Sequence, residues 1–163
     1  MAGDLARRLA AEPLTAIVHS GAIRTRRLAE MVGKRTGLPI RCDPRWLERD
    51  FGSWEGRSWN VIWRETGSLM DRIMTDPTNF RPGGDGETGV ELIRRVQRAW
   101  DGLDKAGNVL IVAHGGSIAA LRTSISGHAP EKMIELVPQH GEVITIAAQQ
   151  ESRLKRRRHY GTL

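Results

Sequence analysis

Two segments of this sequence carry side chains that are suited to holding an anion. His114 follows an apolar run of five residues and precedes two glycines, and Arg24 lies five residues after the apolar run Leu14–His19. A guanidinium fork, an imidazole and the free N–H groups of a helix N-terminus are donors that fit a phosphoryl group. Gly115 lets an anion come close to the backbone. Together these groups indicate a phosphate-binding site.

The predicted secondary structure indicates where Arg24 and His114 would lie. Apolar runs and amphipathic helical patterns alternate along the chain, which predicts an α/β layered fold with a mostly parallel sheet. In such folds ligands bind beyond the carboxyl ends of the strands. The predicted strands are 14–19, 38–42, 109–113 and 142–148. The longer predicted helices are 22–35, 58–75 and 117–126, with another that begins at a capping box formed by Thr88 and Glu91.

Composition limits the class of protein. The chain has 163 residues, of which 39% are hydrophobic and 27% charged, which suits one domain with a real core. Its single cysteine, Cys42, excludes an internal disulfide framework. The sequence has no apolar run of the roughly 18 residues that span a membrane, and its start has no signal-peptide pattern. We therefore expect a cytoplasmic protein with no membrane partner.

The net charge of +6 is concentrated at the C-terminal end. We divide the chain into a domain over residues 1–150 and a basic tail over residues 151–163. Arginines in such a tail can contact nucleic acid. This tail has one aromatic residue, Tyr160, and no recognition motif accompanies it. We therefore interpret it as a solvated tail and do not expect a nucleic-acid partner.

Four motifs in this order resemble the histidine phosphatase superfamily, which includes the cofactor-dependent phosphoglycerate mutases and many small phosphomonoesterases. They are Ser20-x-x-x-Arg24, the segment LERDFGSWEG over residues 47–56, the glycine-rich loop 82–88 and His114-Gly115. The resemblance covers residues 3 to 148. It implies a three-layer αβα sandwich of the phosphoglycerate mutase type, truncated at its N-terminus.

The resemblance also implies roles for individual residues. Arg24 matches the phosphate-binding arginine, and Ser20 and Gly115 are the further phosphate-binding candidates. His114 matches the second active-site histidine, which stabilises the transferring phosphoryl group. Glu48 matches the acid that protonates the leaving oxygen. For Glu55, a second acidic candidate in the same segment, we favour a solvated loop glutamate over a catalytic group.

One departure from the family pattern concerns the nucleophile. The family's first strand ends in Arg-His-Gly, and this tripeptide does not occur among the five histidines, which are His19, His114, His128, His140 and His159. Three explanations stay open: the sequence is a fragment or starts at an internal methionine, the protein is a pseudoenzyme, or another group takes the role. His19 is the candidate substitute, although a strand-end histidine bonded to the backbone is the favoured interpretation.

These observations predict a phosphatase for a small phosphorylated metabolite, acting through a phosphohistidine whose histidine this sequence lacks. The alternatives are a phosphate-ester-binding pseudoenzyme or fragment, and a phosphotransferase of the phosphoglycerate mutase type. The chain has no Gly-x-Ser-x-Gly for a serine hydrolase and no Gly-Lys-Ser/Thr for a P-loop. The family chemistry needs no metal or cofactor. We expect inorganic phosphate or a small phosphorylated substrate as partner, and a homodimer if the lost strand exposes a sheet edge.

Overall fold

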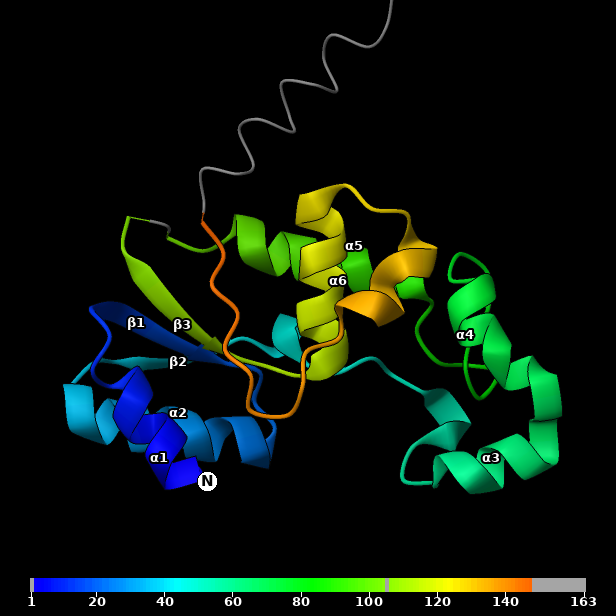
Figure 1. Cartoon of the computed structure of the whole chain (residues 1–163), viewed down its shortest axis with the longest axis horizontal. Coiled ribbons are helices and arrows are strands. Elements are labelled where there is room, and N and C mark those ends of the chain that lie inside the picture. The colour runs from blue at the N-terminus through cyan, green and yellow to red at the C-terminus, as the bar shows by residue number, and fades with distance from the viewer. Residues whose placement is uncertain (1, 105, 148–163) are drawn as a thin grey trace, which may run out of the picture.

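Three parallel strands form the sheet that positions the candidate residues (Figure 1). The computed structural model describes residues 2–104 and 106–147. Its strands are β1 (Leu14–His19), β2 (Ile40–Cys42) and β3 (Asn108–Val112), in the order β2-β1-β3. His19 is in register with Cys42 on one side and with Val112 on the other. All three strands therefore end at the same edge of the sheet.

One face of the sheet is covered by α1 (Ala2–Leu9) and α2 (Ile23–Thr36). Ile17 of β1 and Val112 of β3 point to this side and pack with Ala6, Ala29 and Val32 of the two helices. The helix α2 ends at Gly37, whose φ of 72° is in the left-handed region that favours glycine.

The opposite face is covered by α5 (Gly89–Asp101) and α6 (Gly115–Ser126). Val18, the neighbour of Ile17 in β1, points to this side because successive residues of a strand face opposite ways. Val109 and Ile111 of β3 pack against the same cluster, which also contains Trp46. Helices thus cover both faces of a parallel sheet, and the predicted three-layer αβα architecture is confirmed.

The segment between β2 and α5 differs from the single helix predicted over 58–75. It contains α3 (Trp59–Thr66), a 3-10 turn over Gly67–Asp71 and α4 (Arg72–Thr75). Gly67 has φ 55° and ψ −135°, which ends α3 after two turns. Trp54, Ile62 and Phe80 form a hydrophobic cluster of their own in this part of the chain. Figure 1 shows α3 and α4 set to one side of the sheet and its covering helices.

The last predicted strand, 142–148, is wrong for the residues that the structure describes. Residues 142–147 form no strand, and residue 148 lies outside the described part. Their alternating pattern gives Ile146 a contact with the α5–α6 cluster while Val143 is exposed. An alternating apolar pattern can therefore arise from packing alone. A strand also needs a neighbouring strand to which it can hydrogen-bond. Within the described sheet, β3 pairs only with β1.

The predicted basic tail over residues 151–163 lies outside the described residues. Within the described ranges, no helix is both long and apolar enough to cross a membrane.

The capping box that begins α5 is present as predicted and yields a stability test. The Thr88 hydroxyl accepts the Glu91 N–H at 3.2 Å, and the Glu91 carboxylate accepts the Thr88 N–H at 2.9 Å. We expect Thr88→Ala to lower the free energy of unfolding by about 1 kcal/mol in urea titrations. Thr75→Ala, which removes an exposed hydroxyl bonded to the Asp71 carbonyl, should change it by less than about 0.5 kcal/mol. Equal effects would contradict the capping role.

The pH dependence of the same cap has a defined sign. The Arg81 guanidinium, followed by the Thr88 N–H, lowers the pKa of Glu91 from 4.5 to about 2. The ionised carboxylate therefore contributes stability at neutral pH, and this contribution is lost as the pH falls from 4.5 toward about 2. In Glu91→Gln, the free energy of unfolding should therefore fall less over this pH range, as measured by urea titrations at each pH.

Candidate active site

Arg24 and His114 lie in direct contact, as the sequence predicted. Arg24 is in the first turn of α2, after the end of β1, and His114 joins β3 to α6. The Arg24 Nη2 atom is 2.5 Å from Nδ1 of the His114 ring, although the residues are 90 positions apart. The parallel pairing of β1 with β3 accounts for this contact because it brings the carboxyl ends of both strands together.

His114 is held through both its backbone and its ring. The Ser117 hydroxyl accepts the His114 N–H and donates to the His114 carbonyl, each at 3.1 Å. The ring is buried, and burial lowers the pKa of His114 below its usual value of 6.5. The charge of Arg24 lowers this pKa further, and Glu48 opposes that shift. These effects favour a neutral imidazole.

Ser20 lies on the inner side of this pair. Its side chain is fully buried, and its hydroxyl is 2.7 Å from His114 Nε2 and 2.8 Å from the Thr25 hydroxyl. The Ala22 N–H also donates to it at 3.4 Å. The structure thus places Ser20 beside His114, with its hydroxyl directed at the ring.

Glu48 reaches the N-terminus of α6 from the segment after β2. It is half-buried, and one carboxylate oxygen accepts the Gly116 N–H at 3.3 Å while the other accepts the Arg49 N–H at 3.0 Å. A Cβ at position 116 would lie 2.2 Å from the Glu48 carboxylate, so only glycine allows this approach. Gly115 begins the helix, and a Cβ there would lie 3.2 Å from Val137. In the described structure the Gly116 amide at the N-terminus of α6 is therefore occupied by a carboxylate of the same chain.

The segment that carries Glu48 is fixed by a residue that the sequence analysis did not identify. Arg95 of α5 donates to the carbonyls of Arg45, Leu47 and Glu48 at 2.8, 3.0 and 3.2 Å. The same guanidinium binds both carboxylate oxygens of Glu87 at 2.8 and 2.7 Å. We call this set of contacts the Arg95 clamp. No local motif signals it, because its carbonyl partners lie 47 to 50 residues away in the sequence.

Two further candidates have local partners. The His19 Nδ1 atom accepts the Gly21 N–H at 3.0 Å, which is the arrangement expected of a strand-end histidine bonded to the backbone. The exposed Glu55 accepts the Phe51 N–H at 2.9 Å and so closes its own loop. Neither contact involves Arg24 or His114.

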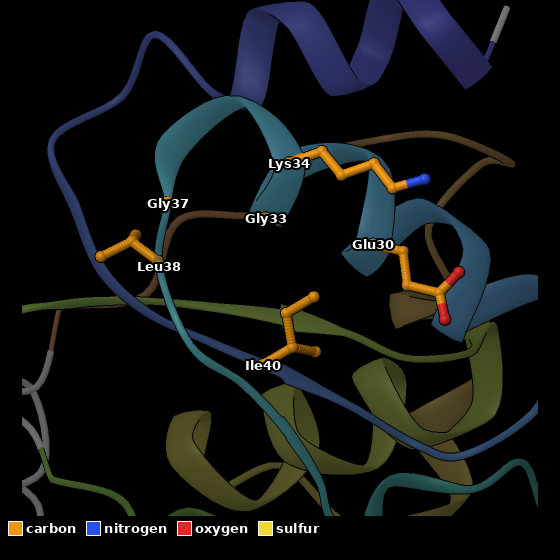
Figure 2. Close-up of a pocket in the computed structure, with 6 residues that line it drawn as sticks. All are labelled: Glu30, Gly33, Lys34, Gly37, Leu38 and Ile40. Carbon is orange, nitrogen blue, oxygen red and sulfur yellow. The ribbon is translucent and has the colours of Figure 1, made fainter.

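A separate pocket lies between the C-terminal half of α2 and β2 (Figure 2). It includes none of the predicted site residues, and its polar side chains are those of Glu30 and Lys34. Within residues 2–104 and 106–147, no group of three or more His, Cys, Asp or Glu side chains is arranged to hold a metal ion.

The Arg95 clamp can be tested through stability. Arg95→Met would leave the mostly buried Glu87 carboxylate and three carbonyls without their donor, so the free energy of unfolding should fall by about 2 to 3 kcal/mol. Arg26→Met removes an exposed arginine that faces Glu30 on α2 and should cost less than about 0.5 kcal/mol. Urea titrations monitored by circular dichroism compare the two variants. Similar losses in both would show that the clamp contributes nothing specific.

Known proteins resemble this chain in sequence and in fold. Residues 1–158 match the histidine phosphatase superfamily (branch 1). The uncharacterized phosphatase PhoE of Bacillus subtilis is 36% identical over 118 residues, which are 71% of this chain and 55% of that protein. The probable phosphoglycerate mutase GpmB of Erwinia tasmaniensis is 30% identical over 117 residues, which are 70% of this chain and 54% of that protein. The chain thus spans about half the length of these curated relatives.

Solved structures show the same fold. The complex of a mycobacterial glucosyl-3-phosphoglycerate phosphatase with inorganic phosphate superposes with a TM-score of 0.69 at 29% identity, covering 81% of this chain and 68% of that one. The family match extends over nearly the whole sequence and includes all the strands and helices of the described structure. The chain therefore belongs to the histidine phosphatase superfamily.

Proposed function

We propose that this chain binds the phosphoryl group of a small phosphorylated metabolite at Arg24 and His114, in the service of phosphoric monoester hydrolysis. The observation that carries the proposal is the 2.5 Å contact between the Arg24 guanidinium and the His114 ring at the carboxyl edge of the sheet. Two side chains at this separation can both contact oxygens of the same tetrahedral anion. The phosphate complex of the mycobacterial relative supports this ligand class.

Each residue then has a distinct task. Arg24 holds and neutralises the phosphoryl oxygens, and His114 donates a hydrogen bond to the charge that grows in the transition state. Glu48, at the N-terminus of α6, is the proposed proton donor to the leaving oxygen. Phosphohistidine chemistry also needs a nucleophilic histidine, and the family's Arg-His-Gly motif does not occur in this sequence. The proposal therefore separates phosphoryl binding, which these residues provide, from covalent transfer.

The exposure of Arg24 favours hydrolysis over a mutase reaction. A mutase must keep water from the transferred phosphoryl group while its substrate reorients. Arg24 is exposed in the described structure, so water reaches the proposed phosphoryl position. A phosphate-ester-binding pseudoenzyme is the second candidate, and the absence of the Arg-His-Gly motif from the sequence is the observation that favours it.

Anion binding provides the direct test of the proposed site. Phosphate titration followed by NMR should perturb the His114 ring, with a Kd of about 1 mM for a site built on one arginine. Arg24→Ala should weaken binding by about tenfold or more, the scale of one charge-assisted hydrogen bond. Arg27→Ala removes an exposed arginine from the same helix and serves as the matched control. Unchanged affinity in Arg24→Ala would contradict the proposal.

Catalysis should require the missing nucleophile. The 163-residue chain should hydrolyse p-nitrophenyl phosphate well below about 1 per second, the low end of ordinary enzymes. Fusing a strand that ends in Arg-His-Gly ahead of Met1 should create activity, and His114→Ala should then reduce it by about 100- to 1000-fold.

The proposed role of Glu48 as proton donor can be tested in the same fusion protein. Glu48→Gln should impair hydrolysis of alkyl phosphates more than of p-nitrophenyl phosphate, because p-nitrophenolate leaves without a proton. Equal losses on the two substrate types would contradict that role. Rapid turnover by the unfused chain would show that another group replaces the nucleophile, which His19→Ala would test.

A further inference from the structure

Four polar groups form a continuous hydrogen-bonded chain behind the proposed phosphate site. Arg24 Nη2 is 2.5 Å from His114 Nδ1, and His114 Nε2 is 2.7 Å from the Ser20 hydroxyl. The Ser20 hydroxyl is 2.8 Å from the Thr25 hydroxyl, which donates to the Ala22 carbonyl at 2.9 Å. This network connects the exposed Arg24 to the Ala22 backbone carbonyl through one imidazole and two hydroxyls.

The two ends of the chain independently fix the position of every proton. A guanidinium only donates, so His114 Nδ1 accepts from Arg24 and carries no hydrogen. At the other end, Thr25 gives its hydrogen to the Ala22 carbonyl and so accepts from Ser20. Ser20 has then used its only hydrogen, and its oxygen must accept from His114 Nε2. Both ends therefore require the tautomer of His114 with the hydrogen on Nε2.

The inner part of this hydrogen-bond network is shielded from water. Ser20, Thr25 and the His114 ring are 0%, 3% and 5% exposed. The Ala22 N–H donates to the remaining lone pair of the Ser20 oxygen, so this hydroxyl has no capacity left for a phosphate. A buried hydroxyl with all its hydrogen-bonding sites in use orients its neighbour and does not bind a ligand directly.

We propose that Ser20 is a positioning residue that directs His114 Nδ1 toward the bound anion, and that anion binding adds a proton to this nitrogen. This inference rests on the proposed phosphate site. Phosphate and sulfate offer only acceptor oxygens to the ring, and an unprotonated Nδ1 would face them with its lone pair. In the imidazolium form Nδ1–H donates to the anion while Nε2–H still donates to Ser20, so the ring keeps its orientation.

The charges around the ring determine the direction of the pH effect. Arg24 from α2 and Arg95 from α5 disfavour the imidazolium, and Glu48 from the segment after β2 favours it. His19 ends β1 and Cys42 ends β2 at the same edge of the sheet. An anion bound beside Arg24 offsets the nearest of the positive charges, so the pKa of His114 rises on binding. By linkage, affinity must then strengthen as the pH falls from about 8 to about 6.

The first test is the tautomer of His114 in the protein without a bound anion. Long-range ¹H–¹⁵N spectra of the histidine-labelled full chain should show the neutral His114 ring with hydrogen on Nε2. Thr25→Val leaves Ser20 free to donate to Nε2 and should shift part of the population to the Nδ1–H tautomer. Thr123→Val is the matched control, since Thr123 is also a buried helical threonine whose hydroxyl donates to a backbone carbonyl. An Nδ1–H ring in the unmodified chain would overturn the proposal.

Sulfate is the probe for proton uptake because it does not titrate between pH 6 and 8. Its affinity for the full chain should rise by about tenfold or more over this range, as one coupled proton allows up to tenfold per pH unit. Ser20→Ala should weaken sulfate binding at pH 6 by about fivefold to tenfold and flatten this pH profile. Thr123→Val should leave the affinity and the pH profile unchanged.

The outcomes distinguish this inference from the proposed function. Sulfate binding that depends on Arg24 but not on pH would overturn proton uptake and leave the phosphate site standing. No sulfate binding at tens of millimolar would overturn both. If Ser20→Ala does not fold, the tautomer of the unmodified chain and of Thr25→Val still decides the role of Ser20.

Discussion

The parallel pairing of β1 with β3 is the constraint on which the candidate site depends. It places His19 in register with Val112, and the Ser20 N–H donates to the Val112 carbonyl at 3.2 Å. The chain then leaves β1 toward Arg24 and leaves β3 toward His114 at the same edge. A shift in this register would move the Ser20 hydroxyl away from the His114 ring and break the buried chain of hydrogen bonds.

The carboxylate of Glu48 depends on a second constraint, which comes from α5. The Arg95 clamp joins the carbonyls of Arg45, Leu47 and Glu48 to α5, a helix that shares a hydrophobic cluster with α6. Gly116 then leaves the space in which the carboxylate meets the helix N-terminus. The proposed acid Glu48 and the proposed anion-binding Arg24 thus come from elements that pack on opposite faces of the same sheet.

The sequence predicts what local patterns and strand ends determine. The β1 strand, the capping box at Thr88 and the meeting of Arg24 with His114 follow from periodicity, capping chemistry and the rule that parallel strands end together. It does not predict features that depend on tertiary partners. The break at Gly67 uses a positive φ that a glycine allows but does not require. The lack of a strand over 142–147 and the Arg95 clamp depend on neighbours distant in the sequence.

Phosphoryl binding and covalent phosphoryl transfer require different residues at such a site. Arg24, His114 and Glu48 are each fixed by contacts within the described residues, and none of these contacts involves a nucleophile. A preorganised set of donors stabilises charge wherever it develops, so it keeps its affinity for anions when no bond can be made. The buried hydroxyls of Ser20 and Thr25 fix the orientation of the imidazole, with its Nδ1 atom at Arg24, before any substrate arrives. The contacts that fix the proposed phosphate site therefore do not depend on the residue that would attack the phosphoryl group.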